Sequence, residues 1–220
     1  MSEIINIFLC IVIPLAVLFC VVKREMRVPV LFLIFGLLIA VLAAYGNAAL
    51  KMAGGFTDLE TVLYVAPLVE ELLKAIPLVL FIFIKKPDIR TALVAAVAVG
   101  AGFATIENIT YMLSYDVNNI GFMLIRGLSA GLMHSMTLVI LTVVIFKLSK
   151  YKYGSATIIV GILSFSMLFH GLYNMLVNSG YSAAAFAGYI LPPLLTLVCL
   201  ILLYRNSIGK FFKRIRRIEE

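Results

Sequence analysis

The sequence predicts an all-α membrane protein, a polytopic bundle of about seven transmembrane helices. Hydrophobic residues make up 63% of the 220 residues and charged residues only 13%, about half of the charged share that soluble domains carry. The apolar residues form runs of roughly 20 residues, the length that spans a bilayer as a helix. The charged residues gather in short segments between these runs. We therefore expect a single integral membrane domain, residues 1–220, embedded in the lipid bilayer.

Each apolar run is interpreted as one membrane helix. The runs are at about 4–22, 28–50, 61–84, 91–113, 120–146, 155–177 and 183–204. The first run has no Lys or Arg before it and lacks a small-residue cleavage site, so it is a poor signal peptide. The chemically interesting residues lie in a motif-bearing core at about 61–177. The basic tail, residues 205–220, is expected to lie on anionic lipid in the cytoplasm.

Basic residues mark alternate loops of the predicted bundle. Most of the 18 Lys and Arg residues follow the first, third and fifth runs or lie in the tail. The positive-inside rule then places the N-terminus outside and the C-terminus in the cytoplasm. The same distribution argues against a nucleic-acid partner, because the net charge of +7 is not gathered on one surface.

The third run contains charges that a packing helix does not need. Glu70, Glu71 and Lys74 lie within one helical turn of an apolar segment. An ionised carboxylate at membrane depth costs at least a few kcal/mol, so such residues usually have a function. Lys74 shares a helix face with both acids, three and four residues away, and is expected to hold one of them ionised.

Other polar side chains lie in the next three runs at a similar depth. They are Glu107 and Asn108, then Ser129 and His134, then His170 and Asn174. At a rise of about 1.5 Å per residue, the acids and both histidines lie about 20–25 Å from the cytoplasmic boundary. In a hydrocarbon core about 30 Å thick, this layer is in the outer half. We predict that Glu70, Glu71, Glu107, His134 and His170 converge in one cavity.

This set of residues supports hydrolysis by either of two routes. Two histidines and several carboxylates could hold Zn²⁺, with one acid left as general base. Alternatively, an ionised Glu activates water without a metal while His and Asn stabilise an oxyanion. The HExxH signature of many metalloproteases is absent. Residues 127–131 match GxSxG, but inside a membrane helix Ser129 is interpreted as a packing residue rather than a nucleophile.

The motifs, in this order, resemble those of the PrsW intramembrane proteases. They are Glu70-Glu71-x-x-Lys74, Phe103-x-x-x-Glu107, the isolated His134, and His170-x-x-x-Asn174. The wider group contains the CAAX prenyl proteases and bacteriocin-processing or abortive-infection proteins, in which the second motif usually ends in His. Glu107 at that position resembles the PrsW branch and removes one zinc nitrogen of the CAAX-type arrangement.

The resemblance implies a multi-pass endopeptidase of the bacterial cell membrane. Its substrate would be a single-pass membrane protein, such as an anti-sigma factor that receives a first, extracytoplasmic cut in a stress response. The implied catalytic residues are Glu70, Glu71, Glu107, His134, His170 and Asn174, with Lys74 and Phe103 in supporting positions. Tyr111 is a further supporting residue because it shares a helix face with Phe103 and Glu107. If Zn²⁺ is bound, His134 and His170 are its ligands together with a carboxylate.

Three other functions stay open at this point. A related protease would process prenylated or bacteriocin peptides. A transporter would use the polar layer, with Lys74 and Arg126, to bind an ion or a small anion. In a purely structural helix bundle, the polar side chains of this layer would only hold the helices together. Cleavage of a single-pass substrate, lost on changing Glu70 or Glu71 to Ala, separates a protease from the other two.

Overall fold

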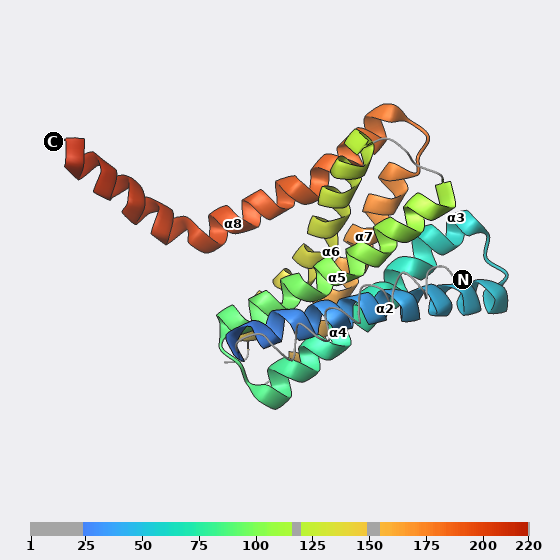
Figure 1. Cartoon of the computed structure of the whole chain (residues 1–220), viewed down its shortest axis with the longest axis horizontal. Helices are drawn as coiled ribbons and strands as arrows, with labels where there is room; N and C mark the ends of the chain where they lie inside the picture. Colours follow the sequence, from blue (N-terminus) through green and yellow to red (C-terminus); the bar gives the residue numbers. More distant parts are fainter. Residues whose placement is uncertain (1–23, 116–119, 149–154, 220) are drawn as a thin grey trace.

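The computed structural model describes residues 24–115, 120–148 and 155–219, and these fold as helices joined by short loops (Figure 1). The elements are α2 (Arg24–Gly54), α3 (Asp58–Glu60), the π-helical segment η1 (Thr61–Val65), α4 (Ala66–Lys85), α5 (Ile89–Tyr115), α6 (Ile120–Leu148), α7 (Ser155–Val177) and α8 (Ser182–Glu219). The all-α prediction is confirmed. The predicted helix at 4–22 lies outside the described residues, so the count of seven helices stays a prediction.

Five of the described helices are long and apolar enough to cross a membrane. The segments are Met26–Gly54, Ile89–Ser114, Ile120–Lys147, Ala156–Val177 and Ser182–Cys199. The prediction of a multi-pass membrane protein is therefore confirmed, whereas the orientation of the termini stays a prediction. Helix α4 is not one of the five because Glu70, Glu71 and Lys74 lie in its middle, and all three side chains are buried among the other helices.

The end of the last helix differs from the prediction. Helix α8 continues to Glu219, well past the expected end at about 204, and Figure 1 shows this part extending away from the other helices. The reason is visible in the sequence: Ile208, Phe211, Phe212, Ile215 and Ile218 recur at helical spacing between basic residues. Such a pattern is typical of an amphipathic helix that lies in a membrane interface.

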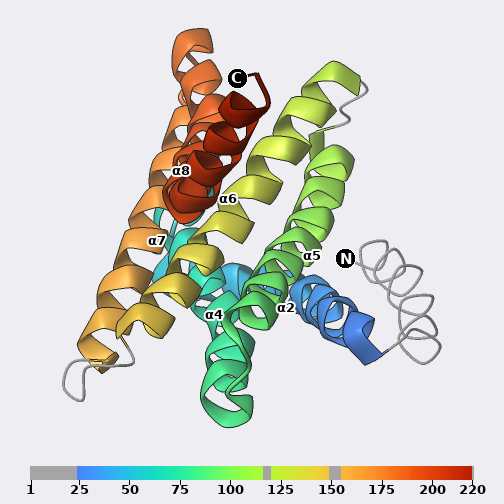
Figure 2. The same cartoon turned by 90° about the vertical axis from the view of Figure 1, so that its left-hand side faces the viewer.

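Small residues let α5 pack closely against both α2 and α6 (Figure 2). A Cβ atom on Gly36 of α2 would lie 2.2 Å from the Val99 carbonyl oxygen of α5, and one on Gly102 would lie 2.2 Å from the Leu33 carbonyl oxygen. On the other side of α5, a Cβ on Gly100 would lie 2.4 Å from the Ser135 Cα of α6. These contacts hold α5, which carries Glu107, against its two neighbours.

The apolar core fills one half of the bundle. It combines the C-terminal half of α4, the N-terminal half of α5 and the C-terminal half of α6, packed on α2, with Leu78, Val99 and Leu141 fully buried. The other halves of these helices, together with the C-terminal half of α7, carry the polar residues. One end of the bundle, near the loop between α4 and α5, is therefore apolar, and the other end is polar.

A capping box begins the chain segment that leads into α4. The Thr57 side chain accepts a hydrogen bond from the Glu60 N–H at 3.2 Å, and the Glu60 carboxylate accepts one from the Thr57 N–H at 2.9 Å. These hydrogen bonds hold the pKa of Glu60 below its usual value. The short α3 runs directly into η1, whose last backbone bond joins the Ala66 N–H to the Thr61 carbonyl.

Candidate metal centre and active site

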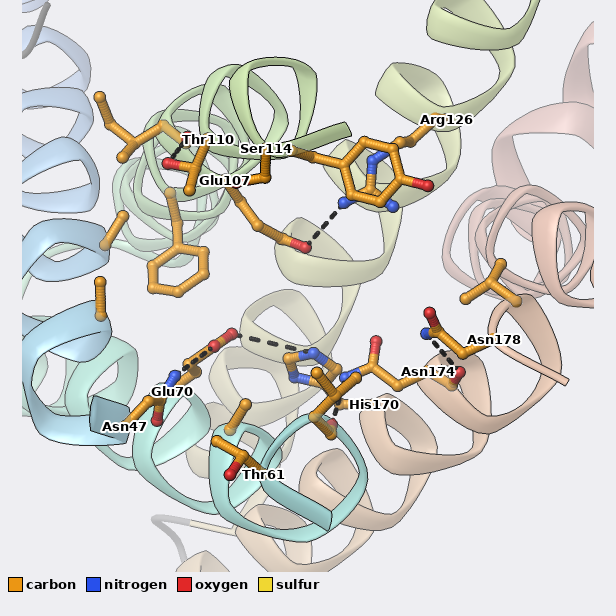
Figure 3. Close-up of a pocket in the computed structure, with 18 residues that line it drawn as sticks. Asn47, Thr61, Glu70, Glu107, Thr110, Ser114, Arg126, His170, Asn174 and Asn178 are labelled. Atoms are coloured by element: carbon orange, nitrogen blue, oxygen red, sulfur yellow. Dashed lines mark hydrogen bonds and ion pairs between the residues drawn. The ribbon is translucent and has the colours of Figure 1, made fainter. Parts of the chain in front are cut away.

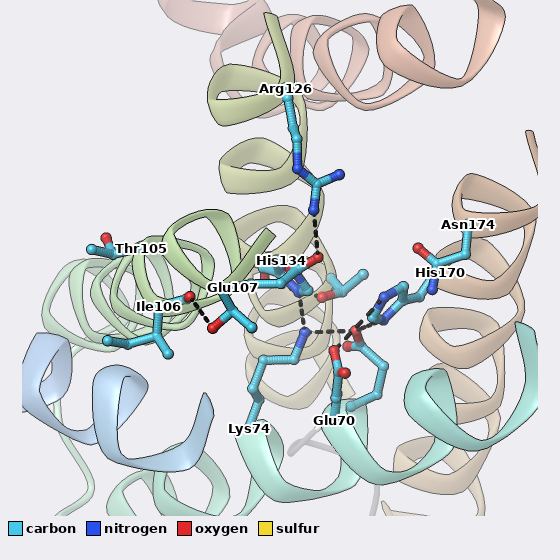
Figure 4. Close-up of polar contacts among 12 residues, drawn as sticks. Glu70, Lys74, Thr105, Ile106, Glu107, Arg126, His134, His170 and Asn174 are labelled. Atoms are coloured by element: carbon cyan, nitrogen blue, oxygen red, sulfur yellow. Dashed lines mark hydrogen bonds and ion pairs between the residues drawn. The ribbon is translucent and has the colours of Figure 1, made fainter. Parts of the chain in front are cut away.

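Ionisable side chains from α4, α5, α6 and α7 meet in the polar half of the bundle (Figure 4). They are Glu70, Glu71, Lys74, Glu107, Arg126, His134 and His170. Glu107 is the most exposed of the acids, with 28% of its side-chain surface accessible, whereas Glu71 has 1% and Glu70 has 11%. Carboxylates can be buried here because each one contacts a cation or an imidazole.

Glu71 is held by two partners on one carboxylate oxygen. Lys74 Nζ donates to Glu71 Oε1 at 2.6 Å, and His170 Nδ1 lies 2.9 Å from the same oxygen. A carboxylate only accepts hydrogen bonds, so Nδ1 of His170 carries a proton and Nε2 is the ring nitrogen whose lone pair is available to a metal ion. That Nε2 lies 3.8 Å from Glu70 Oε2. A carboxylate behind a histidine in this way orients the ring as metal sites require.

His134 is held from both ring nitrogens. Lys74 Nζ lies 2.6 Å from His134 Nδ1, and His134 Nε2 contacts Glu107 Oε2. An ammonium group only donates, so Nδ1 accepts from Lys74 and Nε2 donates to Glu107. The Phe103 ring covers this contact, with its centroid 4.7 Å from that of His134 and 4.8 Å from Lys74 Nζ. Phe103 thus supports the site by excluding water from the Lys74–His134 pair.

Glu107 links His134 to a second cation. Arg126 donates to Glu107 Oε1 at 3.2 Å, and its guanidinium lies over the Tyr111 ring, 3.6 Å from the centroid. Tyr111 therefore contacts the network through the guanidinium of Arg126.

Two asparagines complete the polar contacts. Asn47 of α2 donates from Nδ2 to Glu70 Oε1 at 3.0 Å. The sequence analysis does not identify this residue, and the available signal was an amide near the C-terminal end of an apolar run. Asn174, a predicted catalytic residue, donates from Nδ2 to the Val62 carbonyl oxygen at 2.9 Å. Ser129 is fully buried in α6 and does not line the cavity described next, as its interpretation as a packing residue requires.

A cavity of about 290 Å³ lies beside this network (Figure 3). Its lining includes Glu70, Glu107, Arg126, His170 and Asn174, and it reaches the helix ends at Thr61, Ser114 and Asn178. Glu71, Lys74 and His134 do not line it; they contact the residues that do. The predicted residues are thus brought together, with Glu70, Glu107 and His170 at the cavity surface and the other three behind them.

Glu70, His134 and His170 fit a metal ion. They offer one carboxylate oxygen and two ring nitrogens within 4.8 Å of one another, and all three are buried. Two histidines and one carboxylate, with a position left open, form a ligand set of catalytic zinc sites. The hydrogen bond of His170 to Glu71 uses Nδ1, so Nε2 is the ring nitrogen that faces Glu70 and could bind the metal. A metal bound at Nε2 of His134 must displace the proton that this nitrogen now donates to Glu107.

These features define a class of protein: a multi-pass helical membrane protein with a buried centre of acids and histidines that could hold a metal ion. The model of the PrsW family, described as a family of intramembrane metalloproteases, matches residues 24–204. The match covers most of the chain and every site residue named above, so this chain belongs to the PrsW family. No curated protein and no solved structure matches it.

Membership of the family confirms the resemblance drawn from the four motifs. The protein is an intramembrane protease, which sets aside the transporter and the structural bundle. The family is one of metalloproteases, and the buried Glu70, His134 and His170 could hold its metal.

Proposed function

We propose that this protein cuts a single-pass membrane protein of the bacterial cell membrane on its extracytoplasmic side, and that an anti-sigma factor is the substrate class. The observation that carries the proposal is the position of the cavity. Its lining comes from the N-terminal parts of η1, α4 and α6 and the C-terminal halves of α2, α5 and α7. The basic residues Lys85, Lys86 and Arg90 lie at the opposite end of the bundle, and the positive-inside rule assigns that end to the cytoplasm.

Glu70, His134 and His170 hold the metal in this proposal. When bound, the metal activates a water molecule and polarises the scissile carbonyl. Glu71 orients His170 through the Nδ1 hydrogen bond, and Lys74 balances the charge of Glu71. A buried carboxylate without that cation would carry an uncompensated charge.

Glu107 serves as the general base. It lines the cavity, it is the most exposed acid of the site, and its Oε2 contacts His134 Nε2. Arg126 holds Oε1 of the same carboxylate, so Oε2 is the oxygen that receives a proton from water and later passes it to the leaving amine. The guanidinium also balances the negative charge of the carboxylate that acts as the base.

The substrate must unwind to reach these groups. The carbonyl oxygens of a membrane helix are used in its own hydrogen bonds, and only those at its ends are free. Because the cavity reaches the helix ends at Thr61, Ser114 and Asn178, an extended segment at the outer end of a substrate helix has the shortest route to Glu107.

Mapping the new termini tests the proposal. The purified protein is reconstituted with a single-pass substrate, and the fragments are identified by mass spectrometry, with the Glu107→Gln variant as the inactive control. We expect cleavage within a few residues of the outer membrane boundary. Cleavage in the cytoplasmic half of the substrate helix would contradict the proposed orientation, and cleavage only of prenylated or bacteriocin peptides would favour the other branch of the wider group.

A further inference from the structure

The segment that precedes α4 has a backbone carbonyl without a partner of its own. In η1 the Ala66 N–H bonds the Thr61 carbonyl, so it does not serve Val62, its partner in a regular α-helix. The next residue that a π-helix would use for Val62 is Pro67, which has no N–H. The Val62 carbonyl therefore lacks an intrahelical donor because of both the π-helical register and the proline.

Asn174 of α7 supplies the missing donor. Its Nδ2 lies 2.9 Å from the Val62 oxygen, and 91% of the residue's surface is covered, since its exposure is 9%. One turn earlier on α7, Gly171 allows the close approach: a Cβ there would lie 3.2 Å from the Leu63 carbonyl oxygen and 3.8 Å from Pro67 Cγ. Val62 is half-buried and lines the cavity, so leaving its carbonyl unpaired costs at most about 1–3 kcal/mol; the hydrogen bond to Asn174 joins α7 to η1.

The hydrogen bond between Asn174 and Val62 lies one helical turn from His170, the proposed metal ligand of α7. His170 and Asn174 are four residues apart on one face of that helix, and they contact Glu71 and Val62 respectively. Two contacts thus set the position of α7 against the continuous segment from η1 to α4. That position determines the separation of His170 Nε2 from Glu70 Oε2, which is 3.8 Å.

We infer that Asn174 is a positioning residue, which caps the Val62 carbonyl and thereby sets the spacing between Glu70 and His170, rather than a donor to the oxyanion of the reaction. The inference rests on the proposed catalytic centre but concerns a different contact. The amide has a second hydrogen, so loss of activity in an Asn174 variant does not separate the two roles. An experiment that distinguishes the two roles must change the hydrogen bonding of the Val62 carbonyl.

A substitution at Pro67 can distinguish the two roles of Asn174. Changing Pro67 to Ala restores an N–H that can bond the Leu63 carbonyl in the α-helical register or the Val62 carbonyl in the π-helical register, so the Val62 carbonyl gains a second possible donor beside Asn174. We expect Asn174→Ala to lower kcat/KM by about 100-fold, the scale of a 1 Å misplacement, and the same change in the Pro67→Ala chain to cost less than tenfold. An oxyanion donor would instead cost the same factor in both chains, since the two sites would act independently.

Metal affinity gives a readout that does not depend on turnover. Zn²⁺ titrated against a competing chromophoric chelator should bind Asn174→Ala several-fold more weakly than the wild type, and Pro67→Ala/Asn174→Ala should recover most of this loss. Ser166→Ala is the matched control. Ser166 is a buried polar residue one turn on the other side of His170, and it bonds only its own helix, at the Ile162 carbonyl.

A crosslink between η1 and α7 measures directly whether the two segments stay in contact, even if Pro67→Ala is itself inactive. Tyr64 of η1 and Leu168 of α7 are exposed and line the same apolar groove, so cysteines there can be joined by a short bis-maleimide in a chain whose native cysteines are changed to Ala. We expect Asn174→Ala to lower the crosslinking yield and Ser166→Ala to leave it unchanged. An unchanged yield with Asn174→Ala, whether or not activity is lost, overturns the positioning role. These readouts stay informative even if no outer cut is found.

Discussion

At the scale of single residues, the site is organised by one buried cation. Lys74 Nζ contacts both Glu71 Oε1 and His134 Nδ1 at 2.6 Å. It therefore balances the charge of one acid and selects the ring nitrogen at which His134 accepts a hydrogen bond. No bulk water reaches a fully buried ammonium group, so these partners are what make its charge tolerable.

We predict that Lys74→Met destabilises the protein by about 3–5 kcal/mol, because it leaves the Glu71 carboxylate buried without its counter-charge. Thermal unfolding in detergent micelles measures the effect. Lys51→Met is the matched control: it also removes a lysine from an ion pair, but its partner Asp58 is 94% exposed, so the expected loss is below about 1 kcal/mol. Equal losses in the two variants would show that Lys74 does not balance a buried charge.

We predict that Glu70 and Glu107, the two acids at the cavity surface, have different roles. Glu70→Gln replaces a proposed metal ligand and should lower Zn²⁺ affinity by at least about tenfold. Glu107→Gln should keep the bound metal and lower kcat by about 100-fold or more, since it removes the general base. Metal content by plasma emission spectrometry and initial rates on one substrate give both values. Loss of metal from Glu107→Gln with full retention in Glu70→Gln would reverse the two assignments.

At the scale of helices, close approach between α2 and α5 sets where Glu107 lies. The two carbonyls nearest to Gly36 and Gly102 leave no space for a side chain, so both helices must shift if a methyl group is added. A shift of α5 moves Glu107 away from His134 and Arg126, which ties packing far from the site to its geometry.

We predict that Gly36→Ala destabilises the bundle by about 1–3 kcal/mol through overpacking, since its Cβ would lie 2.2 Å from the Val99 carbonyl oxygen. Gly131→Ala is the control: it is also a glycine in a membrane helix, but nothing lies within 4 Å of its added Cβ, so it should be neutral or slightly stabilising. Thermal unfolding monitored by size-exclusion chromatography compares them. A neutral Gly36→Ala would mean that α2 and α5 do not approach as closely as described.

At the scale of the whole molecule, polarity is divided between the two ends of the bundle. The apolar core occupies the end near the loop between α4 and α5, and the cavity occupies the other. Water and substrate therefore have one short route to the acids and histidines. The side of the membrane on which that route opens decides which part of a substrate is cut.

We predict that the cavity end faces outward. A single cysteine at Ser179, between α7 and α8, should react with a membrane-impermeant maleimide on intact cells. A cysteine at Pro87, between α4 and α5, should react only after the cells are opened. The native cysteines are changed to Ala in both chains, and the unmodified cysteine-free chain is the control. The reverse pattern would place the cavity on the cytoplasmic side and contradict the proposed outer cut.

The sequence by itself determined the class of protein and predicted candidate residues for its site. The length and hydropathy of the apolar runs predict membrane helices because the bilayer demands a minimum span. Charged residues inside such runs, among them Glu70, Glu107 and His134, indicate a site because burying them is costly. Their common depth follows from the helical rise alone, and the four motifs predict the family that residues 24–204 match.

Only the tertiary structure decided which of these residues contact one another. The position of a residue along a helix leaves open how the helix is rotated and how it crosses its neighbours, and these decide side-chain partners. Lys74 thus lies between Glu71 and His134, and Asn47 reaches Glu70 from a helix without any motif. The π-helical register of η1, which no hydropathy pattern reveals, turns the Val62 carbonyl toward Asn174.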